Sequence, residues 1–160
     1  MGDAQLTFSL ERADQADVIA LIDALDAFQK TLYPPKSHHG VDIDALVKPN
    51  VLFAVARDGQ GSAIGCGAVV LRDEYGELKR MYVPEAQRGK GVGRGLLEFL
   101  EGHALRRGCA LLRLETGIHQ PEAQQLYLSS GYVYRSPFND YAEDPNSVFM
   151  EKQLVSGGAT

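Results

Sequence analysis

Glycines at every second position lead directly into a helical leucine pattern in the middle of the chain. They are Gly89, Gly91, Gly93 and Gly95. The apolar residues that follow are three and four positions apart, which predicts a helix that buries one face and ends at Gly108. That face consists of Val92, Leu96, Leu97, Leu100 and Ala104. The first N–H groups of a helix have no acceptor within it, and its dipole favours negative charge there. The segment therefore predicts an anion site.

The rest of the chain is predicted to alternate between strands and helices. Strands are expected over residues 5–10, 51–57, 63–72, 77–83, 109–116, 132–135 and 147–154. Besides the helix after the glycines, helices are expected over 42–47, over 121–130 and from Asp14 or Asp17 onward. The last of these has the apolar face Val18, Leu21, Ile22, Leu25 and Phe28. The order is β-α-α-β-β-β-α-β-α-β-β, which indicates an α+β (mixed α/β) fold.

Length and composition limit the chain to one folded domain. Of the 160 residues, we assign 1–155 to this domain and 156–160 to a flexible tail. No apolar run approaches the ~20 residues of a membrane span. The N-terminal residues form neither a basic leader nor an apolar signal core, so a cytoplasmic location is expected. Cys66 and Cys109 fit neither a metal spacing nor a disulfide framework, and are expected to be reduced thiols.

Charge is distributed unevenly along the chain. The net charge of −5 and the pI of about 5.3 argue against nucleic acid as a partner. Nevertheless, five cationic residues fall within sixteen positions: Lys79, Arg80, Arg88, Lys90 and Arg94. A compact basic stretch in an acidic chain indicates a small polyanionic ligand.

Three kinds of phosphate-binding loop are candidates for this segment. The P-loop of nucleotide hydrolases is excluded, because Gly91 stands where that loop needs Ser or Thr. The dinucleotide pattern G-x-G-x-x-G starts at Gly91, and Glu115 lies about where a ribose-binding acid would be. Its third glycine position, however, holds Leu96, and the strand 77–83 is too polar for the first strand of a buried parallel sheet. The third pattern, Q/R-x-x-G-x-G/A, fits residues 88–93.

Residues 88–93 resemble the coenzyme A loop of the GNAT superfamily of N-acetyltransferases. Further along, that family tends to show N-x-x-A-x-x-x-Y-x-x-x-G-F, and this chain has Gln120-Pro-Glu-Ala123-Gln-Gln-Leu-Tyr127-Leu-Ser-Ser-Gly131-Tyr132. Gln120 and Tyr132 depart from the usual Asn and Phe. The resemblance covers nearly the whole chain. It implies a central, mostly antiparallel twisted sheet of about six or seven strands, flanked by about four helices.

The resemblance also implies acetyl-CoA as cosubstrate, and no metal. The strand 77–83 would present its backbone to the pantetheine arm at Met81, Tyr82 and Val83. The implied contacts of the glycine loop are Arg88, Gly89, Lys90, Gly91, Val92, Gly93 and Arg94. Glycines let the backbone close around a pyrophosphate, and the cations add charge. Gln120 would bond the pantetheine amides.

The chemistry needs a neutral amine, a polarised carbonyl and a proton for the departing thiolate. The resemblance implies that a backbone N–H near Met81 or Tyr82 stabilises the oxyanion, and that Tyr127 is the general acid. The base remains open. Glu77 begins the strand of the coenzyme contacts and is our first choice, Glu115 ends the neighbouring strand, and an unassisted or water-relayed route is the third alternative.

Two loops are expected to shape the acceptor pocket. They contain an aromatic set and an acidic set that would attract a cation: Tyr33, Phe138 and Tyr141, and Asp140, Glu143 and Asp144. His38 and His39 are adjacent and lack partners at ligand spacing, so no metal is expected. The acceptor is expected to be a small primary amine. A polyamine, an amino acid, an aminoglycoside, an aryl-alkyl amine and a protein N-terminus all remain open.

Two other functions remain open at this point. A non-catalytic acyl-CoA-binding module would keep the loop and need neither acid nor base. A nicotinamide-binding domain would be stabilised by a dinucleotide instead. No membrane partner is expected, and a homodimer is an expected form only because dimers are common in the family.

Overall fold

The computed structural model describes residues 5–32, 42–139 and 141–155. Its elements are β1 (Thr7–Leu10), α1 (Ala16–Leu32), α2 (Ile43–Leu46), β2 (Val51–Arg57), β3 (Ala63–Leu71), β4 (Gly76–Tyr82), the 3₁₀ helix η2 (Glu85–Gln87), α3 (Val92–Arg106), β5 (Leu111–Gly117), α4 (Pro121–Ser129), β6 (Val133–Arg135) and β7 (Ser147–Gln153). The predicted order of helices and strands and the α+β class are confirmed. The short η2 was not predicted, because a single turn has too few residues to show a periodicity.

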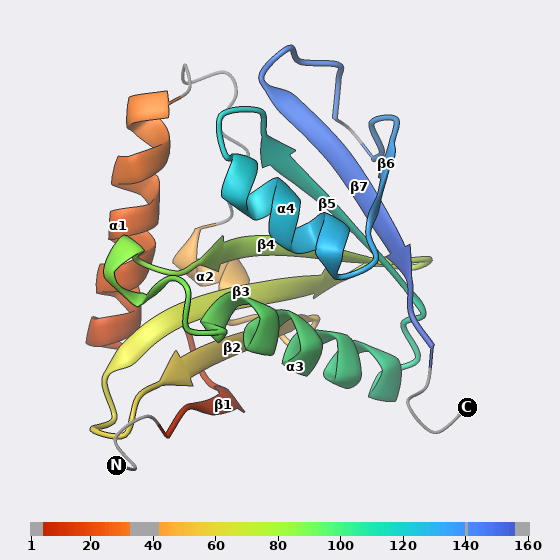
Figure 1. Cartoon of the computed structure of the whole chain (residues 1–160). Coiled ribbons are helices and arrows are strands. Elements are labelled where there is room, and N and C mark those ends of the chain that lie inside the picture. Colours follow the sequence, from red (N-terminus) through yellow and green to blue (C-terminus); the bar gives the residue numbers. More distant parts are fainter. Residues whose placement is uncertain (1–4, 33–41, 140, 156–160) are drawn as a thin grey trace.

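One seven-stranded sheet forms the centre of the molecule (Figure 1). Its strand order is β1-β2-β3-β4-β5-β7-β6. Every neighbouring pair is antiparallel except β4 and β5, which run parallel. The sheet is therefore mostly antiparallel, as expected, and its one parallel junction lies where the helix α3 connects β4 to β5.

Helices cover both faces of this sheet. In β2, Leu52, Ala54 and Ala56 belong to the core cluster under α3, whereas Phe53 and Val55 belong to the cluster under α1 and α2. Successive residues of a strand point to opposite faces, so a strand covered on both sides is apolar at nearly every position. This explains why the sequence of β2 shows no polar alternation.

Helix α3, which connects β4 to β5, has the buried face and the end that its sequence predicts. All five residues of the predicted apolar face of α3 are buried, and Gly108 ends that helix with a φ of +83°. After α4, Tyr132 and Lys152 both bond the carboxylate of Glu101 on α3, at 2.9 and 3.0 Å. A cluster of one acid, one lysine and one tyrosine thus joins α3 to β7.

Two glycines of α3 provide a matched test of its packing. A Cβ at Gly95 would overlap the ring of Phe8, whereas a Cβ at Gly102 would meet no atom within 4 Å. Gly95→Ala is expected to lower the free energy of unfolding by about 1–3 kcal/mol, because the ring must move. Gly102→Ala is expected to raise it by about 0.4–1 kcal/mol, because alanine reduces the entropy of the unfolded chain.

Thermal and urea unfolding of both variants would measure this difference. The opposite signs are the prediction. Equal effects of the two substitutions would mean that Phe8 does not pack against α3 in solution.

Candidate active site

β4 and β5 run side by side over a short distance and then separate. Their pairing consists of Gly76 with Leu112, Glu77 with Arg113 and Leu78 with Leu114. Beyond Leu78, the residues of both strands line a pocket instead of pairing with each other. Within the described part of the chain, the β5-facing edge of β4 after Leu78 has no strand partner. This fork leaves backbone groups of β4 available to a ligand.

A bulge accompanies the separation on the other edge of β4. The register with β3 shifts between Cys66 and Ala68, and Arg80 adopts a φ of +58°. The guanidinium of Arg80 contacts the carboxylate of Asp26 on α1 at 2.6 Å, and the Cys66 thiol donates to the Arg80 carbonyl at 3.5 Å. A positive φ in a residue other than glycine costs about 1–3 kcal/mol, and such strain concentrates at functional sites.

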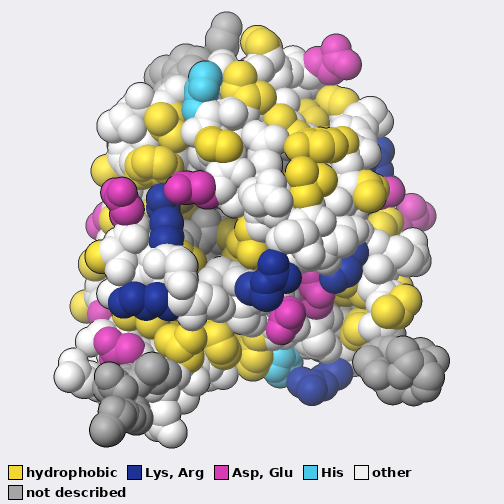
Figure 2. Space-filling model, in the orientation of Figure 1, with side chains coloured by type: hydrophobic (Ala, Val, Ile, Leu, Met, Phe, Trp, Pro, Cys, Tyr) yellow, Lys and Arg dark blue, Asp and Glu magenta, His cyan; other side chains and the backbone are white. Residues whose placement is uncertain are grey.

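The glycine loop borders a cleft of about 450 Å³, which we call the loop cleft. Its walls include ten of the predicted coenzyme contacts: Met81, Tyr82, Val83, Arg88, Gly89, Gly91, Val92, Gly93, Arg94 and Gln120. Figure 2 shows a hollow in this face of the molecule, with Lys and Arg side chains at its rim. Lys90, the remaining predicted loop contact, does not line the cleft, and its ammonium group bonds Gln87 at 3.3 Å.

The loop has the geometry of an anion site. Gly89 and Gly91 have φ values of +80° and +83°, where a side chain would be strained. Gly91 is the N-cap of α3, and no side chain caps that helix start. The N–H groups of the first helical turn, from Val92 onward, therefore lack the acceptor that a capping side chain would supply.

Arg88 and Arg94 both line the loop cleft. Arg88 donates to the carbonyl of Val83 at 2.9 Å and lies over the ring of Phe28, 5.9 Å from its centroid. Arg94 donates to the hydroxyl of Ser129 at the end of α4, at 2.8 Å. Both guanidinium groups are thus held near the loop by neighbouring elements before any anion binds.

A smaller pocket of about 80 Å³ lies between the separated strands, and we call it the fork pocket. Its walls are Leu25, Gln29, Leu78, Lys79, Arg80, Met81, Glu115, Thr116, Gly117, Gln120, Ala123, Tyr127, Tyr141 and Asn146. Five of these residues also line the loop cleft: Leu25, Met81, Gln120, Ala123 and Tyr127. The two cavities therefore meet, and a ligand in one can reach a ligand in the other.

Tyr127 lies at this junction. Its side chain is only 6% exposed, its ring packs edge-on against Tyr132, and its hydroxyl makes no hydrogen bond to the described residues. Burial, with the nearby charge of Glu115, raises the pKa of the Tyr127 phenol above its ordinary value. The hydroxyl is therefore protonated at neutral pH and able to donate.

Glu77 lies on neither cavity wall. Its carboxylate is 1% exposed and contacts Arg72 at 2.7 Å, Lys79 at 3.4 Å and the hydroxyl of Tyr141 at 2.5 Å. Burial alone would raise the pKa of Glu77, but these three partners outweigh it and keep the pKa below its usual value. Glu77 is thus an ionised, fully partnered carboxylate.

Glu115, the second candidate base, does line the fork pocket. It is half-buried and accepts a hydrogen bond from the Ser147 hydroxyl at 2.7 Å. Its charge reaches across the pocket, because it contributes to the raised pKa values of both Tyr127 and Tyr141. Of the two acids considered from the sequence, Glu115 is the one beside the junction.

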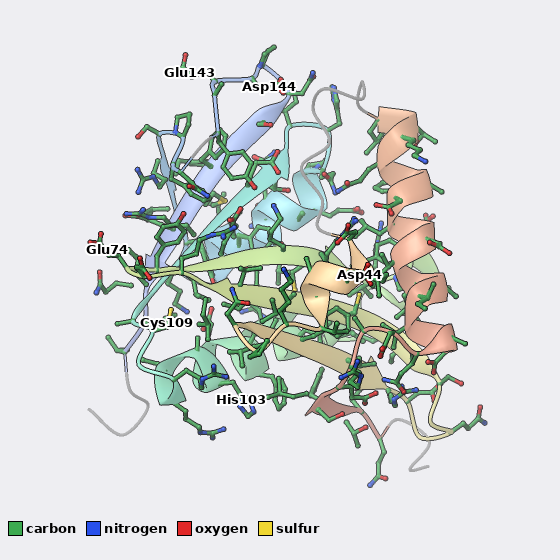
Figure 3. The ribbon with its side chains drawn as sticks, turned by 180° about the vertical axis from the view of Figure 1, so that it is seen from behind. Asp44, Glu74, His103, Cys109, Glu143 and Asp144 are labelled. Atoms are coloured by element: carbon green, nitrogen blue, oxygen red, sulfur yellow. The ribbon has the colours of Figure 1, made fainter. Side chains whose placement is uncertain are left out.

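The predicted acceptor residues separate in the structure. Tyr141 lines the fork pocket, whereas Phe138 is 4% exposed and packs among Tyr75, Tyr141 and Phe149 without lining it. Tyr33, His38, His39 and Asp140 lie outside the described residues. Figure 3 shows Glu143 and Asp144 at the outer end of the loop before β7, and neither lines the fork pocket.

Several residues of these walls were not assigned a functional role from the sequence. Leu25 and Gln29 come from α1, and Asn146 precedes β7. Leu25 has the spacing of a core residue, and no local pattern distinguishes the two amides from surface residues. Among the described residues, no group of three or more His, Cys, Asp or Glu could hold a metal, and no helix is long and apolar enough to cross a membrane.

With this fold and site, the chain belongs to the acetyltransferase (GNAT) family, which it matches over residues 20–132. It is 43% identical to the IAA acetyltransferase of Azospirillum brasilense, over 93% of this chain and 98% of that protein. A crystal structure from Klebsiella pneumoniae, described as an acyl-CoA N-acyltransferase, is also 43% identical, with a TM-score of 0.81 over 94% of this chain and 99% of that one.

The fold extends to more distant proteins. PaiA N-acetyltransferase from Thermoplasma acidophilum, solved in complex with coenzyme A, is 16% identical, with a TM-score of 0.71 over 94% of this chain and 99% of that one. The family, the fold and the acetyltransferase class predicted from the sequence are therefore confirmed.

Proposed function

We propose that this enzyme transfers an acetyl group from acetyl-CoA to the primary amine of a small acceptor. The observation that carries the proposal is the Tyr127 hydroxyl, protonated and without a partner among the described residues, at the meeting point of the loop cleft and the fork pocket. A cosubstrate in the first cavity and an acceptor in the second would meet beside this hydroxyl.

Acetyl-CoA would occupy the loop cleft. Its pyrophosphate would bind the N–H groups of the glycine loop and of the first turn of α3, with Arg88 and Arg94 beside it. The pantetheine arm would follow the unpaired edge of β4, from Val83 to Met81, with Gln120 available to its amides. The thioester would then lie at Tyr127. Lys90 would contribute charge from the rim.

The reaction would proceed by direct attack on the thioester. Glu115 would take a proton from the acceptor ammonium, the neutral amine would form the new C–N bond, and a backbone N–H near Met81 or Tyr82 would stabilise the oxyanion. The C–S bond would then break, with Tyr127 giving its proton to the departing thiolate. The nitrogen would lose its second proton to water as the amide forms, and Tyr127 and Glu115 would return to their starting forms by proton exchange with solvent. We place Glu115 before Glu77 as the base because Glu77 lies off both cavity walls and is bonded by three side chains. Glu77 remains the alternative.

The first test is the thermal midpoint with acetyl-CoA, coenzyme A, NAD or buffer alone. A ligand at about 100 times its Kd adds about 2.7 kcal/mol to the free energy of unfolding, which shifts the midpoint by several degrees. Both coenzyme A species are expected to give this shift and NAD to give none. Arg88→Ala should lose most of it, whereas Arg106→Ala, an exposed arginine at the other end of α3, should keep it.

A shift with NAD and none with coenzyme A would overturn the cosubstrate. Catalysis is then tested by measuring coenzyme A release with a panel of amines. IAA is included because the relative from Azospirillum brasilense is called an IAA acetyltransferase. A non-catalytic acyl-CoA-binding module would show the thermal shift and release no coenzyme A with any acceptor.

A further inference from the structure

We propose that the acceptor is a small α-amino acid, whose carboxylate binds at Lys79 and Arg80 while its amine faces Glu115 and Tyr127. This inference rests on the proposed acetyl transfer and names the substrate class of the same site. The acidic loop residues considered from the sequence predicted a pocket for a cation. The described walls of the fork pocket instead contain two cations and one carboxylate.

The two cations reach the pocket because β4 is irregular there. In a regular strand, successive residues point to opposite faces, so Lys79 and Arg80 would not border the same cavity. The bulge and the φ of +58° at Arg80 break this alternation, and both residues line the fork pocket. Their side chains are 10% and 8% exposed. The strained backbone thus brings Lys79 and Arg80 to one wall of the fork pocket, where the guanidinium of Arg80 also contacts Asp26 of α1.

Lys79 shares its carboxylate partner with a second cation. Lys79 and Arg72 share a single carboxylate, that of Glu77, at 3.4 and 2.7 Å. Tyr141, which bonds both Lys79 and Glu77, is neutral because burial raises the pKa of its phenol. These four side chains together carry one net positive charge, and the carboxylate of Glu115 acts on Lys79 from the other wall of the pocket. A carboxylate bound beside Lys79 would give this largely buried ammonium group a further charged hydrogen-bond partner.

The opposite wall is suited to an amine. Glu115 is the one carboxylate on the described walls of the fork pocket. Lys79, Tyr127 and Tyr141 line the same pocket, and the charge of Glu115 acts on all three. An ammonium beside Glu115 and a carboxylate beside Lys79 would complement both walls. An α-amino acid has these two groups on one carbon, the shortest separation available.

The volume of the pocket limits the size of this amino acid. About 10–15 Å³ of such volume accommodates one water-sized atom. The 80 Å³ of the fork pocket therefore accommodates about five to eight non-hydrogen atoms, the range from glycine to threonine, and a larger acceptor would extend beyond its described walls. A polyamine would bring further positive charge toward Lys79 and Arg80, and an aminoglycoside would exceed the described space.

The experiment compares acids with their amides on the protein loaded with coenzyme A. Glycine, alanine, serine and threonine, and the four corresponding amino acid amides, are titrated by isothermal calorimetry. At least one of the acids is expected to bind about 10- to 100-fold more tightly than its amide, because a charged hydrogen-bonded pair is lost in the amide. Equal binding, tighter binding of the amides, or no binding of any acid would overturn the inference.

Variants assign the preference to the proposed residues. Lys79→Met is expected to remove the preference for the acid. Lys152→Met is the matched control. Lys152 also pairs with a largely buried glutamate that accepts a hydrogen bond from a tyrosine, in this case Glu101, but Lys152 does not line the fork pocket. If Lys79→Met does not fold, Arg80→Gln replaces it as the test variant. Asp26, which pairs with Arg80, is 40% exposed, so water can solvate its carboxylate when the guanidinium group is removed.

Coenzyme A release separates this inference from the proposed function. If coenzyme A were released as fast with amines and amides as with acids, the proposed acetyl transfer would stand, and the inference that the acceptor is an amino acid would be overturned. Release with no compound, in a protein that still binds acids more tightly than amides, would overturn acetyl transfer and leave the carboxylate site.

Discussion

Tyr127→Phe is expected to lower kcat by about 10²- to 10⁴-fold, with little change in the KM for acetyl-CoA. The substitution removes one hydroxyl from the junction of the loop cleft and the fork pocket and keeps the ring that packs against Tyr132. The thiolate must then leave without a proton from the enzyme. Steady-state release of coenzyme A measures the loss, and thermal unfolding shows whether the variant is folded.

The dependence on pH sharpens this test. Because burial and Glu115 raise the pKa of Tyr127, its hydroxyl stays protonated as the pH rises past neutrality. The wild-type rate should therefore not fall between about pH 6 and pH 9, and the deficit of the variant should be constant over that range. Tyr132→Phe is the control: it loses the bond to Glu101 and some stability, and it should retain kcat. An unchanged rate of Tyr127→Phe at every pH would remove Tyr127 as the acid.

Glu115→Gln is expected to lower kcat/KM by about 10²-fold near pH 7. A primary ammonium has a pKa near 10, so only about one acceptor molecule in 10³ is neutral at that pH. Without a base, the reaction depends on this fraction, which grows about tenfold for each pH unit. The kcat/KM of the variant should therefore rise steeply with pH, and the difference between its kcat/KM and that of the wild type should become smaller.

Glu77→Gln distinguishes the two candidate bases. Glu77 holds Arg72, Lys79 and Tyr141 together, so its loss should mainly lower the free energy of unfolding. If Glu77→Gln gave the steep pH profile and Glu115→Gln did not, Glu77 would be the base. If neither did, the route would be unassisted or relayed by water that other groups hold.

Local patterns were sufficient to predict most of the fold. The apolar face of α3 repeats at three and four residues, and all its members are buried. The hydrophobic residues of β2 are bounded by turn signals, and its predicted and observed limits agree at 51–57. The glycine loop was also visible, because positive φ values and a helix start leave a glycine-rich signature in a few residues.

The chemistry of the fork pocket depends on contacts that no local pattern contains. Glu77 lies near the start of a strand, so the sequence suggested an accessible acid. In the structure, the hydroxyl of Tyr141, 64 residues further along the chain, donates a hydrogen bond to the buried carboxylate of Glu77. Arg80 is neither glycine nor asparagine, so nothing in its identity predicts the positive φ that brings it to the wall beside Lys79. The local sequence indicated an acidic loop that would attract a cationic acceptor, whereas the described walls of the fork pocket contain Lys79 and Arg80 with the single carboxylate of Glu115.

The short pairing of β4 with β5 has a consequence for the whole protein. Three residue pairs join the part of the sheet formed by β1 to β4 to the part formed by β5, β7 and β6. A ligand bound in the fork pocket would contact both parts and act as a clamp between them. Each tenfold rise in its concentration above Kd strengthens that clamp by about 1.4 kcal/mol. The lifetime of the folded enzyme against proteolysis would thus follow the supply of the compounds that it consumes.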